Sequence, residues 1–248
     1  MPKLNRNNNL QPFEGPKSRF SELCFAISVF FQFLKGFRYL HFEGPSISIF
    51  GSARFGEDDV YYQKAREIGF RVAKAGFNVV TGGGPGVMEA ASRGAKEAGG
   101  HTIGINIELP FEQKVNPYLD IWVNIKYFFI RKVLLFKYSV GFIIMPGGLG
   151  TLDEFFEVFT LVQCEKIPKF PIVLFGSEYW SKLIEQLQIM EAHQTISAED
   201  HDIYLITDSY DEAIAFLLNR IDQNKIDGKK FKRKWWLAER LKKSGPLS

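Results

Sequence analysis

Three short segments of this sequence combine glycine with small polar residues, and each follows a short apolar run. They are Gly51-Ser52-Ala53-Arg54, Thr81-Gly82-Gly83-Gly84-Pro85-Gly86 and Pro146-Gly147-Gly148-Leu149-Gly150-Thr151. Glycine allows a positive φ and a close approach of the backbone to a ligand. The helix that follows such a turn offers unpaired N–H groups and a partial positive charge to an anion. Two glycine-rich turns from one sheet predict a cradle for a phosphate or carboxylate.

Carboxylates lie just after the third glycine turn, where Asp153, Glu154 and Glu157 open a predicted helix. Glu154 and Glu157 are three residues apart and are expected to share a helix face. The spacing from Thr151 to Glu154 also fits a capping box, in which Glu154 bonds back to the helix start. Glu89 has a similar position after the second turn, where the helix dipole favours an acid. From these patterns alone, capping and chemistry both remain open for Glu154.

Two adjacent cations, Arg131 and Lys132, interrupt an otherwise aromatic and aliphatic segment that begins at Tyr127. This segment is a predicted helix, and it precedes the strand that leads into the Pro146 turn. One interpretation is a charged surface patch on an amphipathic helix. The other is a pair of cations for an anionic ligand.

Several common catalytic motifs are absent from the sequence. G-x-G-x-x-G and G-x-x-x-x-G-K-[ST] do not occur, which argues against a dinucleotide fold and a P-loop nucleotidase. H-E-x-x-H and G-x-S-x-G are also missing, and the four histidines are scattered. Cys24 and Cys164 lie far apart and form no zinc spacing. We therefore expect neither a metal nor a cofactor.

The elements that must position these residues follow a regular alternation from Ser46 onward. The predicted strands are Ser46–Phe50, Asn78–Thr81, Thr102–Ile105, Ile121–Asn124, Gly141–Met145, Ile172–Phe175 and Tyr204–Ile206. The predicted helices are Asp58–Ala75, Pro85–Ala98, Tyr127–Lys137, Leu152–Cys164, Glu178–Met190 and Asp211–Ile221. Such alternation predicts an α/β fold with a Rossmann-like, doubly wound parallel sheet in a single domain. Ligands bind such sheets at the carboxyl ends of the strands, near the switch in strand order.

The chain divides into an N-terminal extension (1–44), the α/β domain (45–222) and a basic tail (223–248). In the extension, Phe20–Phe42 is apolar and aromatic, but charged residues interrupt it. Its uncharged run is shorter than the roughly 20 residues that cross a bilayer. We expect an extra N-terminal helix that packs on the main domain or on a second subunit.

Charge is distributed unevenly, although the formal net charge is only +3. Residues 229–243 contain eight Lys or Arg and a single acid, so the rest of the chain is net acidic. A solvated terminal helix is the simplest interpretation of this tail, and contact with anionic lipid or nucleic acid is the alternative. We expect no nucleic-acid partner.

Few cysteines and the lack of a signal-peptide pattern favour the cytoplasm.

At this point the motifs resemble those of one known family. Pro146–Glu154 resembles the P-G-G-x-G-T-x-x-E signature of the LOG family, the cytokinin riboside 5′-monophosphate phosphoribohydrolases that are also labelled possible lysine decarboxylases. Gly82–Ala91 resembles the family's G-G-G-x-G-x-M segment, and Arg131-Lys132 its R-K pair. The similarity runs from about Ser46 to Arg220 with both glycine motifs in order.

The resemblance implies a homodimer, or a higher homo-oligomer, with active sites near the subunit interface. It also implies hydrolysis of the N-glycosidic bond of a nucleoside 5′-monophosphate, either AMP or a cytokinin riboside monophosphate, to free base and ribose 5-phosphate. Arg131 and Glu154 are then the catalytic pair. The implied substrate- and phosphate-binding residues are Ser52, Gly83, Gly84, Gly86, Met88, Glu89, Lys132, Gly147, Gly148, Gly150 and Thr151.

A non-catalytic nucleotide-binding or regulatory module is the alternative function. It would keep the glycine cradle while Glu154 serves only as a cap. A decarboxylase has less support, because no lysine is marked by the sequence as the Schiff-base residue of a pyridoxal-phosphate enzyme.

Overall fold

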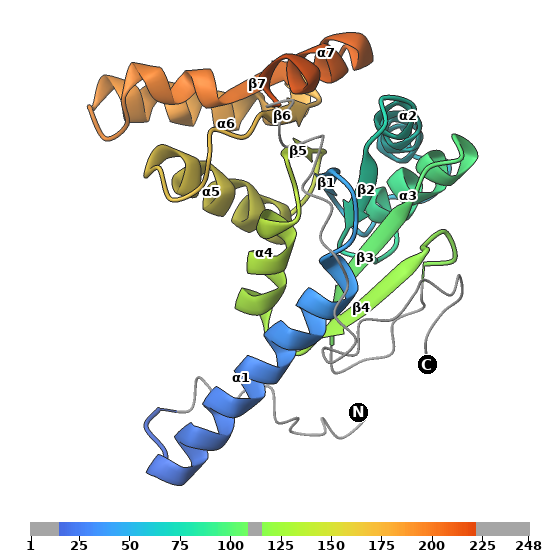
Figure 1. The fold of residues 1–248 in the computed structure, drawn as a ribbon. Coiled ribbons are helices and arrows are strands. Elements are labelled where there is room, and N and C mark those ends of the chain that lie inside the picture. Colours follow the sequence, from blue (N-terminus) through green and yellow to red (C-terminus); the bar gives the residue numbers. More distant parts are fainter. Residues whose placement is uncertain (1–14, 109–115, 222–248) are drawn as a thin grey trace, which may run out of the picture.

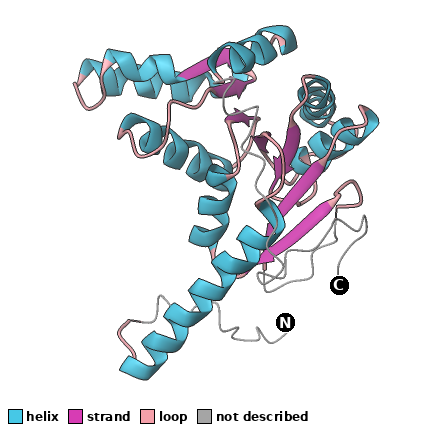
Figure 2. Cartoon of the chain, in the orientation of Figure 1, coloured by secondary structure: helices cyan, strands magenta, loops and turns pink. Residues whose placement is uncertain are grey.

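The computed structural model describes residues 15–108 and 116–221 of the chain. They form a seven-stranded sheet in which every strand pair is parallel, in the order β4-β3-β2-β1-β5-β6-β7 (Figures 1 and 2). The strands are β1 (Ser46–Phe50), β2 (Asn78–Thr81), β3 (Thr102–Ile107), β4 (Ile121–Ile125), β5 (Gly141–Ile144), β6 (Ile172–Phe175) and β7 (Tyr204–Thr207). The predicted Rossmann-like α/β sheet is therefore confirmed.

Helices cover both faces of the sheet. They are α1 (Arg19–Leu40), α2 (Val60–Lys74), α3 (Val87–Glu97), α4 (Phe128–Lys137), α5 (Leu149–Gln163), α6 (Ser177–Ala192) and α7 (Tyr210–Arg220), with a short 3-10 helix, η2, at Ala198–Ile203. Strand side chains alternate between two hydrophobic cores, because successive residues of a strand point to opposite faces. On β5, Phe142 and Ile144 join the core under α1, α4, α5 and α6, whereas Ile143 joins the core under α2, α3 and α7.

The switch in strand order lies between β1 and β5. The chain winds outward from β1 through β2 and β3 to β4, and then returns to place β5 on the other side of β1. In such sheets the ends of the two strands at the switch diverge and leave room for a ligand. The glycine turns after β1, β2 and β5 all lie at this carboxyl edge.

Helices α2 and α3 cross at very short range, and glycines permit this. A Cβ on Gly69 would lie 2.0 Å from the Ala91 carbonyl oxygen, and one on Gly94 would lie 1.7 Å from the Arg66 carbonyl oxygen. Both obstacles are backbone atoms, which cannot rotate away. The close crossing fixes α3, whose N-terminus carries the Gly86 turn.

Gly94→Ala is expected to destabilise the protein by about 1–3 kcal/mol, because the added methyl group forces α2 and α3 apart. Urea denaturation followed by circular dichroism measures the change. Gly56→Ala is the control, since a Cβ there meets nothing within 4 Å. Equal stability of the two variants would contradict the close-packing argument.

The predicted N-terminal helix is confirmed as α1, and it packs on the domain. Phe25, Val29, Phe33 and Phe37 contact the core that lies under α4 and α5. By its length and composition alone, α1 is long and apolar enough to cross a membrane. Only 6% of its most apolar 18-residue stretch is buried. The tail at residues 223–248 and the first 14 residues lie outside the described part of the chain.

Candidate active site

Ser52 joins the three glycine turns at the carboxyl edge of the sheet. Its backbone N–H donates to the Pro146 carbonyl at 3.0 Å, and its own carbonyl accepts from the Val87 N–H at 2.9 Å. The turns after β1, β2 and β5 are therefore held together by the backbone of one residue. A Cβ on Gly86, whose φ is +69°, would lie 2.4 Å from the Ser52 carbonyl oxygen. Only glycine fits that position without strain.

The turn after β5 leaves the N-terminus of α5 open. The cap position is Gly148, which supplies no side-chain hydrogen bond, and the first turn of α5 contains no acid. Gly148, Leu149 and Gly150 are exposed, and Leu149 is 86% exposed. Unpaired N–H groups at an accessible helix start suit an anion such as phosphate.

The capping-box interpretation of Thr151 and Glu154 is wrong. Helix α5 begins at Leu149, three residues earlier than predicted, so Thr151 already lies within the first turn. A Cβ on Gly147 would lie 2.1 Å from the Thr151 hydroxyl oxygen, which places this side chain against the glycine turn. Glu154, one turn further on, is directed to a different partner.

That partner is Arg131 of α4. Its Nη1 donates to Glu154 Oε1 at 3.0 Å, and its Nε donates to the Ile105 carbonyl within β3 at 2.9 Å. Both side chains are buried, with 12% and 11% of their surfaces exposed. A Cβ on Gly82 would lie 2.1 Å from Arg131 Nη2, so the guanidinium also lies against the turn after β2. The Arg131–Glu154 pair thus lies between the two glycine turns.

Burial raises the pKa of Glu154, and the Asp153 charge adds to the increase, while Arg131 and Lys132 oppose it. The net direction is upward. A carboxyl group whose pKa is shifted toward neutral pH exchanges protons more readily under physiological conditions. A buried acid with a raised pKa is a candidate for catalysis.

Lys132, which was predicted to bind the substrate, pairs with two acids of α5 in the structure. Its Nζ lies 2.8 Å from Asp153 Oδ2 and 2.7 Å from Glu157 Oε2, so it pairs with one face of α5. Burial lowers the pKa of Lys132, but the hydrogen bonds to Asp153 and Glu157 raise it overall. Glu157 therefore neutralises Lys132, while Glu154 binds the neighbouring Arg131.

The remaining predicted residues lie on the turn after β2 and at the start of α3. Gly83 has a φ of +74°, and its N–H donates to the Thr81 hydroxyl at 3.1 Å. The Met88 side chain contacts the open sides of Gly82 and Gly84, where added Cβ atoms would lie within 2.8 Å of it. Glu89 accepts a hydrogen bond from the Tyr62 hydroxyl at 3.2 Å. These contacts shape the wall opposite α5.

Tyr179 is a site residue that the sequence did not indicate. It comes from α6, and its hydroxyl donates to the Gly147 carbonyl at 2.8 Å. Its ring also meets Tyr61 edge to face, with ring centroids 6.0 Å apart. Because no local motif marks Tyr179, only the tertiary fold reveals that it supports the glycine turn after β5.

Tyr179→Phe is expected to weaken phosphate binding about two- to tenfold, the equivalent of one lost hydrogen bond of about 0.5–1.5 kcal/mol. Titration with inorganic phosphate, or the KM of an active substrate, measures the effect. Tyr61→Phe is the control, because it removes a hydroxyl from the neighbouring ring and leaves the Gly147 bond intact. Similar affinities for the two variants would show that Tyr179 does not support the turn.

A separate cavity of about 660 Å³ lies at the far end of α5 and α6. Its lining includes Gln163, Glu191 and Asp200 and no cationic side chain. Such a lining is unsuited to phosphate. Within the described residues, no group of three or more His, Cys, Asp or Glu side chains is arranged to hold a metal ion.

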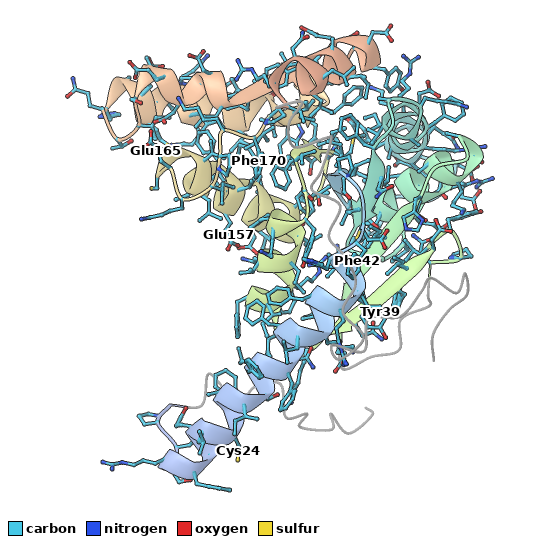
Figure 3. All side chains as sticks on the ribbon, in the orientation of Figure 1. Cys24, Tyr39, Phe42, Glu157, Glu165 and Phe170 are labelled. Atoms are coloured by element: carbon cyan, nitrogen blue, oxygen red, sulfur yellow. The ribbon has the colours of Figure 1, made fainter. Side chains whose placement is uncertain are left out.

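The fold and the site together define a Rossmann-like α/β protein with three glycine turns at one edge of the sheet and a buried Arg–Glu pair. The sequence model of the family described as "Possible lysine decarboxylase" matches residues 88–217. The chain belongs to this family, which confirms the LOG resemblance. Figure 3 shows how the side chains, including Glu157 on α5, fill the space around this part of the sheet.

Two curated relatives are named as cytokinin riboside 5′-monophosphate phosphoribohydrolases. The cytokinin riboside 5′-monophosphate phosphoribohydrolase of Rhodococcoides fascians is 27% identical over 173 residues, which are 68% of this chain and 87% of that protein. The protein of that name from Mycobacterium tuberculosis is 34% identical over 98 residues, or 39% of this chain and 52% of that protein. The chain thus spans most of the first relative and about half of the second.

Two solved structures with the same fold are named for the molybdenum cofactor. A molybdenum cofactor binding protein from Rippkaea orientalis aligns with a TM-score of 0.55 at 25% identity, covering 73% of this chain and 99% of that one. A molybdenum cofactor carrier protein from Chlamydomonas reinhardtii has a TM-score of 0.54 at 26% identity, covering 71% and 98%. The fold is thus shared by proteins named for hydrolysis and proteins named for cofactor binding.

Proposed function

We propose that this chain hydrolyses the N-glycosidic bond of a nucleoside 5′-monophosphate, releasing the free base and ribose 5-phosphate. The observation that carries the proposal is the buried Arg131–Glu154 pair, held between two glycine turns that suit a phosphate. The relatives named as phosphoribohydrolases support the same reaction.

In the proposed reaction, the phosphate binds at the open N-terminus of α5 and fixes the ribose beside Glu154. Binding energy from the phosphate is thereby used to orient the reacting sugar. Glu154 takes a proton from water as the water oxygen bonds to C1′ and the C1′–N bond breaks. The departing base leaves with the bonding electrons and receives the proton that Glu154 took from the water, which returns Glu154 to the carboxylate form. The carboxylate also stabilises the oxocarbenium-like transition state.

Arg131 has two tasks in this scheme. It compensates the charge of Glu154 in a buried setting, and its guanidinium presents further donors to the base or the ribose. Its bond to the Ile105 carbonyl of β3 holds the guanidinium in place. The proposed partners are a nucleoside monophosphate substrate and a second copy of the chain, in the cytoplasm.

A screen of nucleoside 5′-monophosphates for released base, read by chromatography, tests the proposal. AMP and cytokinin riboside 5′-monophosphates are the first substrates to include. Release of base together with ribose 5-phosphate supports the reaction. Binding of monophosphates without release of any base would contradict it and favour the second function.

That second function is ligand binding without turnover. The molybdenum cofactor binding proteins share the fold over 97% or more of their own length, which shows that this architecture also serves carriers. In a carrier, the glycine cradle would be retained while Glu154 and Arg131 form only a structural ion pair. The buried carboxyl with a raised pKa favours the hydrolase.

A further inference from the structure

Of the three glycine turns at the carboxyl edge of the sheet, only the turn after β1 carries a charged side chain. That residue is Arg54, two positions after Ser52. Arg54 is exposed, and its guanidinium forms no ion pair with any residue in the part of the chain that the structure describes. A cation without an acid partner, next to a turn that suits an anion, is a candidate ligand for that anion.

The backbone before Arg54 lies against the starts of two helices. The Ser52 N–H donates to the Pro146 carbonyl at 3.0 Å, on the turn that leads into α5. The Ser52 hydroxyl oxygen accepts a hydrogen bond from the Arg54 N–H at 3.1 Å. A Cβ on Gly86, which caps α3, would lie 2.9 Å from the Ala53 Cα. The backbone of Arg54 is therefore close to the N-termini of both α3 and α5.

Aromatic contacts hold the chain on the other side of Arg54. The ring centroid of Phe55 lies 5.3 Å from that of Tyr61. Tyr61 in turn meets the ring of Tyr179, whose hydroxyl donates to the Gly147 carbonyl at 2.8 Å. The chain is thus attached to the turn before α5 on both sides of Arg54. From this position a long arginine side chain can reach an anion at the α5 N-terminus.

The other two cations of the site are already paired with acids. Arg131 pairs with Glu154, and Lys132 pairs with Asp153 and Glu157. When all five side chains are ionised, two cations face three carboxylates, so the group is net negative. A phosphate monoester brings a further charge of about −1.5 to −2 near pH 7. The helix N-terminus supplies only about half a positive charge, so tight binding of a phosphorylated ligand calls for another cation.

We propose that Arg54 binds the phosphate group of the ligand and makes the site select phosphorylated ligands over the corresponding nucleosides. The planar guanidinium donates to two phosphate oxygens at once. Arg54 has no ion pair to break when the ligand binds, whereas recruiting Arg131 or Lys132 would break one. The proposal rests on the proposed function for the place of the phosphate. Arg54 lies outside the three matched motifs and before residues 88–217, so the family match assigns it no role.

Calorimetric titration with ribose 5-phosphate tests the proposal without requiring turnover. Arg54→Met is expected to raise the Kd roughly ten- to hundredfold, because hydrogen bonds between charged groups are lost. Arg54→Lys retains the charge and is expected to recover much of the affinity. Lys64→Met is the matched control, since Lys64 lies 5.7 Å from the centre of the Tyr61 ring and also forms no ion pair with the described residues. Salt screens a cation that does not touch the ligand, so its Kd is expected to stay within about threefold of the wild type.

Kinetics give a second measurement. For a nucleoside 5′-monophosphate that is hydrolysed, Arg54→Met is expected to raise the KM much more than it lowers kcat, because Arg54 contacts the phosphate and not the breaking bond. Binding of ribose 5-phosphate that Arg54→Met weakens supports the role of Arg54 even when no base is released, so the hydrolase proposal can fail alone. Unchanged affinity in Arg54→Met, an equal loss in Lys64→Met, or no binding of ribose 5-phosphate by the wild type would overturn the proposal.

Discussion

Replacing Glu154 by glutamine is expected to lower the rate of base release from a nucleoside 5′-monophosphate by about 10²–10⁴-fold, the usual contribution of a positioned acid–base group. Glutamine keeps the size of the side chain and still accepts the hydrogen bond from Arg131 Nη1. It cannot take a proton from water. The loss therefore appears in kcat, while phosphate binding at the α5 N-terminus is retained.

The matched control for this experiment is Glu157→Gln. Glu157 stands one turn later on the same helix and undergoes the same chemical change, but its partner is Lys132. Its kcat is expected to stay within a few-fold of the wild type. Adenine release from AMP, followed by chromatography, compares the two variants. Equal rates for Glu154→Gln and the wild type would remove Glu154 from the chemistry.

The pH dependence of kcat gives an independent check on the same residue. Burial and Asp153 raise the pKa of Glu154, so its ionisation is expected at a higher pH than that of an ordinary glutamate near 4.5. Activity that needs the carboxylate therefore declines as the pH falls through this raised value. In Glu154→Gln the decline of kcat at low pH is expected to disappear. If Glu154 had only a structural role, the decline would remain in this variant.

Most of the sheet could be predicted because its signals are local. The first, second and sixth strands begin and end at the predicted residues. Doubly covered parallel strands are continuous apolar runs bounded by glycine or polar residues, and such runs are easy to delimit. The glycine turns could be placed at one edge for the same reason, since strand ends of a parallel sheet share that edge.

The start of α5 was predicted three residues too late, and this error suggested a capping box that the structure does not contain. Gly148-Leu149-Gly150 has low helix propensity and no Ser, Thr, Asp or Asn at the cap, so it resembles a turn. Because α5 begins at Leu149, Thr151 lies inside the helix and cannot cap it. Glu154 instead accepts a hydrogen bond from Arg131. The ion pairs between α4 and α5 are tertiary contacts. The spacing of residues within one helix therefore does not predict them. Asp153 and Glu157 lie four apart and both bind Lys132, whereas the sequence had suggested grouping Glu157 with Glu154.

The second large effect is expected from Arg131→Met, which removes one partner of the buried ion pair. Leaving a buried carboxylate without its cation costs about 3–5 kcal/mol of stability. Lys132→Met is the control. It removes the adjacent cation of the same helix, but its partners Asp153 and Glu157 are 54% and 35% exposed. Water screens such groups, so the control is expected to lose about 1 kcal/mol or less.

The pH dependence of this loss of stability distinguishes the charge interaction between Arg131 and Glu154 from simple packing. Arg131 lowers the pKa of Glu154, so its removal raises that pKa further above the ordinary value near 4.5. A carboxyl with a raised pKa in the folded state retains a proton that the unfolded chain releases above about pH 4.5, so stability falls as the pH rises through the folded pKa. The deficit of Arg131→Met relative to the wild type is therefore expected to be smaller at pH 5 than at pH 8. Urea denaturation at the two pH values measures it, and a deficit that does not change with pH would mean that the guanidinium acts through packing rather than charge.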